Sequence, residues 1–143
     1  MEKLRILFLC TGNSCRSQMA EAFVNHEHAQ RAEAFSAGTS PRPIHPLALA
    51  VMQELGIDIS QKKSKPVETF SGETFDQFIT LCDRARENCP LAFEGQRRLH
   101  MGFSDPAEVI GTEEEKLAEF RIVRDAIQVW LSEYFDAIEG EYN

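Results

Sequence analysis

Two residues six positions apart, Cys10 and Arg16, could perform nucleophilic chemistry on an oxyanion. Both belong to the loop 10–17, which follows an apolar run at 4–9 and leads into an apolar stripe of helical spacing. In such a strand–loop–helix unit, backbone N–H groups point inward and the helix N-terminus adds partial positive charge. The loop is therefore predicted to cradle an oxyanion. Its predicted oxyanion-binding residues are Thr11, Gly12, Asn13, Ser14, Cys15, Arg16 and Ser17.

The cradle also predicts the state of the Cys10 sulfur. Inward N–H groups, the helix dipole and the Arg16 guanidinium all favour a thiolate over a thiol. The planar guanidinium can hold two oxygens of a tetrahedral oxyanion. The loop therefore predicts a thiolate nucleophile aimed at a bound oxyanion. The alternative is a buried Cys10 that only packs at a strand end.

Two further cysteines, Cys82 and Cys89, follow another predicted strand. The six residues between them are more than the two to four that usually separate a structural zinc pair. A disulfide between them is feasible if 83–88 can change conformation. Cys82 could attack whatever becomes attached to Cys10, and Cys89 could resolve the resulting disulfide. A four-cysteine zinc site and a pair of inert thiols are the alternatives; Cys15 either tunes the loop or only packs.

Asp105, followed by Pro106, is the candidate acid. A carboxylic acid beside the cradle could protonate a departing oxygen, and crowding by a thiolate and an oxyanion favours its protonated form. Asp before Pro is equally typical of a turn, so both interpretations stay open. The histidines show no metal-ligand spacing and are interpreted as non-catalytic. They are His26, His28, His45 and His100.

Composition predicts one globular domain over residues 1–143, with 43% apolar and 27% charged residues. The net charge of −8 lies in 105–143, which holds eleven acidic and three basic residues. The sequence has no basic stripe of the kind that binds nucleic acid, and no apolar run in it is long enough to span a membrane. We therefore expect a monomeric cytoplasmic protein, in which cysteines are more often catalytic or redox-active than structural.

Strands alternate with helices along the chain, which predicts an α/β fold: a four-stranded parallel sheet with helices on both faces. The predicted strands are 4–9, 33–37, 75–82 and 98–103, and the predicted helices are 16–28, 46–55 and 113–138. Inward-facing residues of the second helix are predicted to be Ala48, Val51, Met52 and Leu55. Thr112 and Glu115 form a predicted capping box. Because anion sites lie at the carboxyl ends of parallel strands, Cys10, Cys82 and Asp105 are expected at one edge.

With these motifs assembled, the sequence resembles the thioredoxin-coupled arsenate reductases, which share the fold of the low-molecular-weight protein tyrosine phosphatases. The matching stretches are 10–21, 36–38, 81–82, 88–90, 102–103 and 105–106. The likeness continues into the last helix as far as Ile127.

The resemblance implies arsenate as substrate, phosphate and sulfate as competing oxyanions, and a thiol cascade. Arsenate would sit against Arg16, and Cys10 would attack arsenic while Asp105 protonates the leaving oxygen. Cys82 would then attack Cys10 and release arsenite. Cys89 would attack Cys82, and thioredoxin would reduce the Cys82–Cys89 disulfide. No tightly bound cofactor is implied.

Members of this group can also bind potassium beside the loop, at positions matching Asn13, Glu21, Ser36 and an acidic residue. In this chain the fourth position is Lys65, which puts the potassium site in doubt. The expectation is that the Lys65 ammonium occupies that space, reaches toward the other three residues and supports the loop. No metal is expected.

The alternative function is a tyrosine phosphatase of the same fold, which needs only Cys10, Arg16 and an acid. It would leave Cys82 and Cys89 without a role. It would also need an aromatic rim to hold a phenyl ring, and residues of other types follow Pro106. A non-enzymatic thiol sensor would leave Arg16 without a role.

Overall fold

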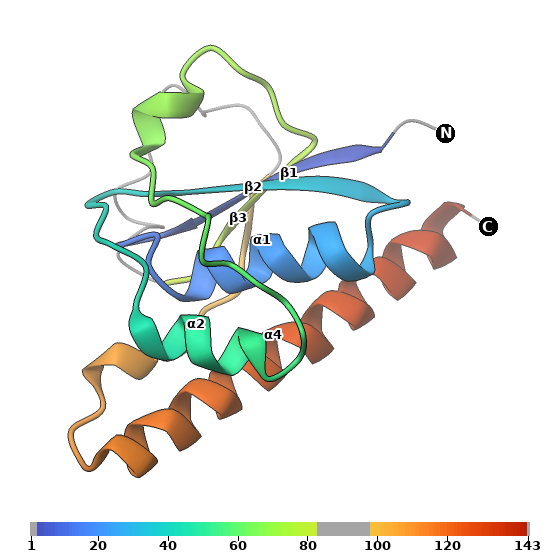
Figure 1. Cartoon of the computed structure of the whole chain (residues 1–143). Helices are drawn as coiled ribbons and strands as arrows, with labels where there is room; N and C mark the ends of the chain where they lie inside the picture. The colour runs from blue at the N-terminus through green and yellow to red at the C-terminus, as the bar shows by residue number, and fades with distance from the viewer. Residues whose placement is uncertain (1–2, 83–97, 143) are drawn as a thin grey trace.

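The computed structural model describes residues 3–82 and 98–142. Four parallel strands form one sheet in the order β2-β1-β3-β4 (Figure 1). They are β1 Leu4–Cys10, β2 Ala32–Gly38, β3 Gln77–Thr80 and β4 Arg98–His100. The predicted α/β fold with a four-stranded parallel sheet is confirmed. The last two strands are shorter than predicted, because their paired registers cover only 77–80 and 98–100.

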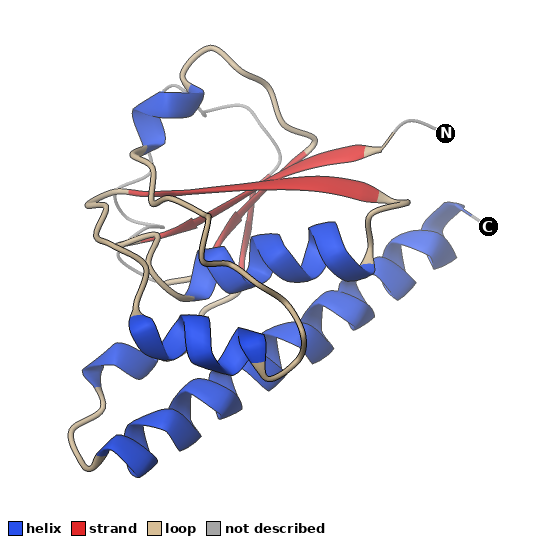
Figure 2. Ribbon diagram, in the orientation of Figure 1, coloured by secondary structure: helices blue, strands red, loops and turns tan. Residues whose placement is uncertain are grey.

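Three α-helices and two short 3₁₀ helices accompany the sheet. They are α1 Arg16–Glu27, α2 Pro46–Gln53, η1 Val67–Phe70, η3 Pro106–Glu108 and α4 Glu113–Tyr142. Helices α1 and α4 run together along one face of the sheet, with α2 beside α4, and η1 lies over the opposite face (Figures 1 and 2). Among the described residues, all three α-helices thus lie on one face, and the only helix on the other face is the 3₁₀ helix η1, which differs from the predicted placement of helices on both faces.

Apolar side chains on both faces of β1 explain why this strand is central. From Ile6 to Leu9 every side chain is fully buried. On the η1 face, Phe35 of β2 meets Phe70 and Phe75 edge-to-face, each pair of ring centroids being 5.8 Å apart. Burial on both faces fixes the register of β1, and with it the position of the loop that follows Cys10.

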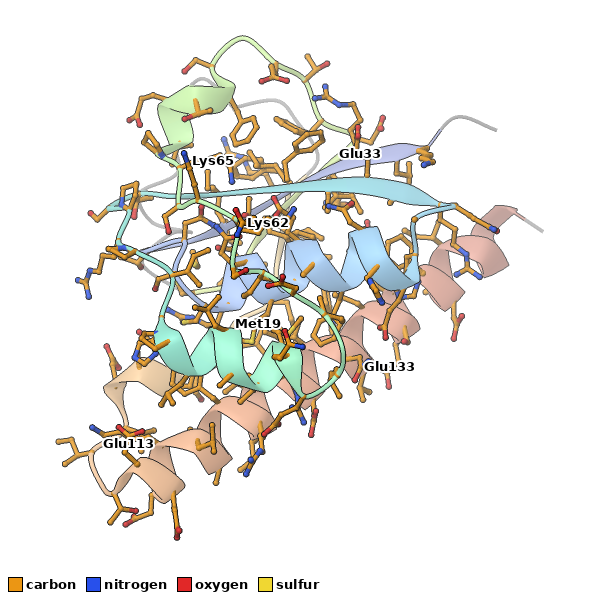
Figure 3. The ribbon with its side chains drawn as sticks, in the orientation of Figure 1. Met19, Glu33, Lys62, Lys65, Glu113 and Glu133 are labelled. Atoms are coloured by element: carbon orange, nitrogen blue, oxygen red, sulfur yellow. The ribbon has the colours of Figure 1, made fainter. Side chains whose placement is uncertain are left out.

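The long helix α4 begins as the capping box predicts. The Glu115 N–H donates to Thr112 Oγ1 at 3.1 Å, and the Glu115 carboxylate accepts from the Thr112 N–H at 3.3 Å. Figure 3 shows Glu113 and Glu133 pointing away from the sheet, whereas Met19 on α1 is fully buried. The acidic charge of the C-terminal segment thus lies on a solvent-facing side of α4.

The second helix differs from its prediction at one end. It stops at Gln53, and Gly56 adopts φ +76 just after it. Ala48, Val51 and Met52 are fully buried, but Leu55 is 40% exposed because it lies beyond the last helical turn. The prediction that Leu55 faces inward was wrong. No helix among the described residues is long and apolar enough to cross a membrane.

Candidate active site

The carbonyl groups of the loop between β1 and α1 accept hydrogen bonds from neighbouring segments. Backbone N–H groups of the segment 39–45 donate to the loop carbonyls, and Ser64 Oγ donates to the remaining one. These bonds are Thr39 to Cys10 (3.4 Å), Ser40 to Thr11 (2.8 Å), Arg42 to Gly12 (2.9 Å), Ser64 to Asn13 (2.7 Å) and His45 to Ser14 (2.9 Å). With the carbonyl oxygens fastened outward, the loop can turn its N–H groups inward, which is the arrangement of an anion nest.

The end of β2 passes so close to this loop that only glycine fits there. A Cβ built on Gly38 would lie 2.7 Å from the Thr11 carbonyl oxygen and 2.8 Å from the Asn13 nitrogen. Both atoms are backbone and cannot move aside without deforming the loop. Gly38 therefore allows β2 to press the segment 39–45 against the oxyanion loop.

Cys10 lies at the end of β1 with its sulfur in a chain of polar contacts. Its Sγ lies 2.9 Å from Ser17 Oγ, which accepts a hydrogen bond from Asn13 Nδ2 at 2.7 Å. Because Asn13 occupies the hydroxyl oxygen as donor, the Ser17 proton is free to point at the Cys10 sulfur. The network thus places a hydroxyl that can donate a hydrogen bond to the Cys10 sulfur.

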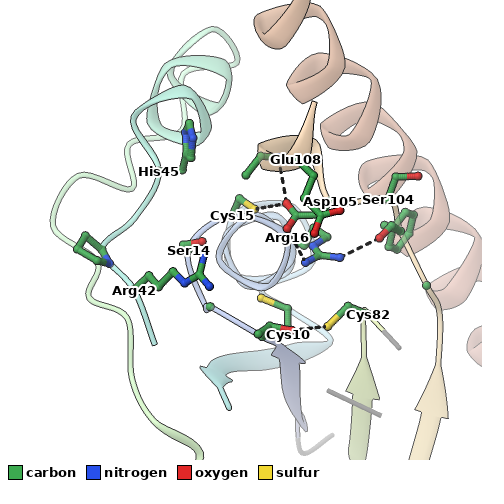
Figure 4. Close-up of a pocket in the computed structure, with 16 residues that line it drawn as sticks. Cys10, Ser14, Cys15, Arg16, Arg42, His45, Cys82, Ser104, Asp105 and Glu108 are labelled. Atoms are coloured by element: carbon green, nitrogen blue, oxygen red, sulfur yellow. Dashed lines mark hydrogen bonds and ion pairs between the residues drawn. The ribbon is translucent and has the colours of Figure 1, made fainter. Parts of the chain in front are cut away.

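Arg16 and Asp105 meet on the other side of the loop (Figure 4). The Arg16 guanidinium donates to the Phe103 carbonyl at 3.0 Å and lies 3.4 Å from Asp105 Oδ2. Burial alone lowers the pKa of Arg16, but the negative charges of Cys10 and Asp105 outweigh it, and the pKa is raised. Arg16 is therefore a permanent cation at the cradle.

Asp105 begins a turn and also lies beside the loop. Its Oδ1 accepts from the Ala107 N–H at 3.0 Å and caps η3, so it does begin a turn. That turn points its Oδ2 toward Arg16. The turn thus places a carboxyl group beside the oxyanion loop.

Cys82 lies just beyond β3, next to the loop (Figure 4). The Leu81 N–H donates to the Leu9 carbonyl at 2.8 Å, which continues the pairing of β1 and β3 up to Cys82. Cys82 Sγ lies 3.2 Å from Thr11 Oγ1 and is 8% exposed. Among the described residues, Cys10, Cys15 and Cys82 form no disulfide with one another. Cys89 lies outside the described residues.

Cys15 is buried and is held as a thiol. Burial raises its pKa from 9.0 to about 12, and the negative charges of Cys10 and Asp105 add to the shift. Its Sγ lies 3.9 Å from Asp105 Oδ1, toward which it can donate. A protonated thiol at neutral pH is a poor nucleophile, so the chemistry falls to the other cysteines.

The raised pKa of Cys15 predicts a loss of stability in alkali. An unfolded Cys15 loses its proton near pH 9.0, whereas the folded one keeps it until about pH 12, so the folded state binds more protons in this window. The free energy of unfolding should therefore fall with rising pH, by at most about 1.4 kcal/mol per pH unit. Urea unfolding under reducing conditions should show a shallower fall for Cys15→Ser; parallel curves would contradict the prediction.

The loop forms one wall of a cleft of about 690 Å³. Cys10, Cys82, Arg16 and Asp105 all line it, so the structure brings together the residues expected at one sheet edge. The cleft also includes residues that the sequence did not indicate, namely Arg42, Pro43, His45, Ser104, Ala107 and Glu108. Figure 4 shows Arg42 across the loop from Asp105.

His45 illustrates what sequence reasoning missed. Its Nδ1 accepts from the Leu47 N–H at 3.1 Å, so it caps α2, and its own N–H holds the Ser14 carbonyl. Burial lowers its pKa. The position just before Pro46, at a helix start, was the available signal, although histidine is an uncommon N-cap.

The lysine expected beside the loop is replaced by its neighbour. The Lys65 ammonium donates to the Lys63 carbonyl at 3.0 Å, whereas the Lys62 ammonium lies 3.4 Å from Glu21 Oε2. Lys65 does contact Asn13, but through its backbone N–H, at 2.9 Å from Oδ1. The Lys65 ammonium thus bonds the Lys63 carbonyl rather than Asn13, Glu21 or Ser36; burial lowers its pKa, and the negative charge of Glu21 opposes that shift. Figure 3 shows Lys62 close to α1 and Lys65 apart from it, toward η1.

The residues that could hold potassium do not fit an ion in this chain. Asn13 Oδ1 already accepts hydrogen bonds from Gln18 and Lys65, and Ser36 Oγ donates to Glu21 Oε1 at 3.2 Å. The other Glu21 oxygen faces the Lys62 ammonium. An internal cation thus balances the carboxylate. The part of the chain that is described holds no cluster of three or more histidine, cysteine or acidic residues suited to a metal.

The structure thus places a thiol and a guanidinium in one loop at the edge of a four-stranded parallel sheet, and this combination indicates the class of protein. The family described as low molecular weight phosphotyrosine protein phosphatase matches residues 5–143, and the chain belongs to this family.

Within the family, the chain is most usefully compared with reductases. It is 43% identical over 134 residues to a Bacillus subtilis (strain 168) protein named arsenate reductase, covering 94% of this chain and 96% of the relative. A solved structure described as an arsenate reductase in the phosphate binding state has a TM-score of 0.76 and 32% identity, covering 96% and 99% of the two chains. A thioredoxin-dependent arsenate reductase from Corynebacterium glutamicum has a TM-score of 0.64 and 28% identity, covering 94% and 63%.

Proposed function

We propose that this protein reduces arsenate to arsenite with a relay of thiols that thioredoxin regenerates. The observation that carries the proposal is a second cysteine at the oxyanion loop, Cys82, with its sulfur 3.2 Å from Thr11 Oγ1. A phosphatase needs only one thiol at this place. The relatives named arsenate reductase support the same chemistry.

In the first step, arsenate binds in the loop against Arg16. The Cys10 thiolate attacks arsenic, and Asp105 gives a proton to the departing oxygen, which leaves as water. An S–As bond forms and an As–O bond breaks, so arsenic keeps its oxidation state. Asp105 can reach the departing oxygen because η3 holds its carboxyl group at the edge of the cleft, and the incoming oxyanion and thiolate favour its protonated form.

In the second step, the Cys82 thiolate attacks the sulfur of Cys10. The electron pair of the S–As bond passes to arsenic, which becomes As(III) and leaves as arsenite, and a Cys10–Cys82 disulfide forms. The Thr11 hydroxyl can donate to the Cys82 sulfur at 3.2 Å and so stabilise the attacking thiolate. Adjacent parallel strands carry the two cysteines, which keeps them within a local rearrangement of each other.

In the third step, the Cys89 thiolate attacks Cys82 and expels the Cys10 thiolate, leaving a Cys82–Cys89 disulfide. Thioredoxin supplies the two electrons that reduce it. The Corynebacterium glutamicum relative, described as thioredoxin-dependent, supports this electron donor. Sulfate and phosphate, which share the tetrahedral shape of arsenate, would compete for the loop.

The proposal includes a single-domain monomer in the cytoplasm. A relay that runs on reduced thiols and a thioredoxin partner suits a reducing compartment.

The experiment that tests the function is arsenate turnover in the presence of thioredoxin, thioredoxin reductase and NADPH. We expect arsenate to drive NADPH oxidation and phosphate not to, because the relay needs an oxyanion whose central atom accepts two electrons. Slow hydrolysis of an aryl phosphate without any arsenate-dependent turnover would favour the phosphatase alternative and reject the proposal.

A further inference from the structure

A short segment, 62–65, lies against the back of the oxyanion loop; we call it the strap. Ser64 Oγ donates to the Asn13 carbonyl at 2.7 Å, and the Lys65 N–H donates to Asn13 Oδ1 at 2.9 Å. Gln18 joins the two pieces, because its Nε2 donates both to Asn13 Oδ1 and to the Lys63 carbonyl, each at 3.1 Å. The strap is thus hydrogen-bonded to the loop at Asn13.

Asn13 is the loop residue that most needs such support. It is fully buried and has φ +48, a left-handed conformation that non-glycine residues seldom adopt. Its side chain donates to Ser17 Oγ, which lies 2.9 Å from the Cys10 sulfur. Whatever holds the strap therefore also holds the contacts that reach the nucleophile.

An ion pair between Lys62 and Glu21 connects the first residue of the strap to α1. Glu21, on α1, is only 4% exposed. Ser36 donates to its Oε1, while its Oε2 receives no hydrogen bond from any described residue and lies 3.4 Å from the Lys62 ammonium. A carboxylate buried this deeply needs a counter-charge, and the ammonium of Lys62 supplies it from the strap. The Lys65 ammonium hydrogen-bonds the Lys63 carbonyl within the strap and interacts with Glu21 only through their charges.

We propose that Lys62 is a positioning residue: its ammonium, held by buried Glu21, latches the strap against the loop and keeps Asn13 and Ser17 in place for oxyanion binding and for Cys10. The role in reduction rests on the proposed function, but the role in oxyanion binding does not. It follows that the chain carries its own cation at Glu21 and needs none from the solvent.

Removal of the ammonium should leave the Glu21 carboxylate uncompensated and loosen the strap. For Lys62→Ala we expect sulfate binding weaker by about fivefold to tenfold, and a similar rise in KM for arsenate with a smaller change in kcat. The space left beside Glu21 would admit a small cation. Potassium should therefore restore the variant, whereas the bulky tetramethylammonium ion should not.

The experiment compares four proteins: wild type, Lys62→Ala, Lys62→Arg and Lys63→Ala. The last removes a neighbouring positive charge while keeping the Lys63 carbonyl that Gln18 and Lys65 use. Sulfate binding, arsenate kcat and KM, and thermal midpoints are measured in potassium chloride and in tetramethylammonium chloride at equal ionic strength, so that screening is constant. Only Lys62→Ala should depend on the cation, and Lys62→Arg should behave as wild type.

Three outcomes would overturn the proposed role of Lys62. The first is a Lys62→Ala protein that matches Lys63→Ala in both salts, and the second is a wild type that itself depends on potassium. The third is a Lys62→Ala protein with a lowered thermal midpoint but unchanged sulfate binding. Failure of the proposed function looks different. In that case no protein reduces arsenate, while the cation-dependent loss of sulfate binding in Lys62→Ala persists.

Discussion

Replacing Cys10 with serine is expected to abolish arsenate reduction while leaving the fold and oxyanion binding in place. A serine hydroxyl is far less nucleophilic than a thiolate and forms no stable bond that Cys82 could displace. We expect a loss of about a thousandfold or more in kcat/KM, as for other enzymes that lose their nucleophile. The hydroxyl can still contact Ser17 Oγ, which the Cys10 sulfur approaches at 2.9 Å, so the loop should keep its shape.

The measurement is NADPH oxidation coupled to thioredoxin, with sulfate binding as the check on the loop. Cys15→Ser is the matched control, because it changes a thiol of the same loop whose pKa is raised to about 12 and which is therefore protonated at neutral pH. The control should keep substantial activity. If Cys10→Ser turned over arsenate as well as the control does, another thiol would have to be the nucleophile.

The strand, loop and helix around Cys10 could be predicted from the sequence because their causes are local. An apolar run, a small polar loop with one glycine and an amphipathic stripe specify β1, the oxyanion loop and α1 within 24 consecutive residues. The sheet-edge rule then brought Cys82 and Asp105 to the same place, since both follow parallel strands. The turn that Asp105 begins is also what places its carboxyl group beside Arg16, so the turn interpretation and the acid interpretation do not exclude each other.

The residues that the sequence did not reveal act across long separations. The segment 39–45 fastens the loop carbonyls through backbone N–H groups, which carry no side-chain signature. Lys62 and Lys65 are equally basic, and only the path of the strap decides which ammonium reaches Glu21. Leu55 was misplaced for a related reason, because the end of α2 fell two residues earlier than its apolar spacing suggested.

The packing also explains the aromatic side chains of α4, which the sequence alone did not. Trp130 stacks on Tyr134 with ring centroids 5.5 Å apart and meets Phe103 edge-to-face at 6.3 Å. The carbonyl of Phe103 accepts from Arg16, so the aromatic side of α4 supports the wall of the cleft. Helical spacing predicted which residues of α4 face inward, but it could not indicate which of them would lie behind the active site.

Replacing Cys89 with serine is expected to stop the relay after its second step. Arsenate should then yield about one arsenite per chain, and a Cys10–Cys82 disulfide should accumulate, because the thiol that resolves it is missing. Pairing of β1 with β3 carries Cys10 and Cys82 at neighbouring strand ends, and Thr11 contacts the Cys82 sulfur at 3.2 Å, so formation of this bond needs no distant partner. Multiple turnover with thioredoxin should be lost.

Peptide mapping by mass spectrometry after one equivalent of arsenate identifies the linkage. The double variant Cys15→Ser/Cys89→Ser is the control: it should form the same Cys10–Cys82 disulfide, because Cys15 is not in the relay. A Cys10–Cys15 disulfide in the single variant, or a free Cys82 thiol after arsenite release, would show that the electrons leave Cys10 by another route. Since Cys82 is a thiol beside the loop that a one-thiol phosphatase does not need, the state of its sulfur after one turnover decides between the two chemistries.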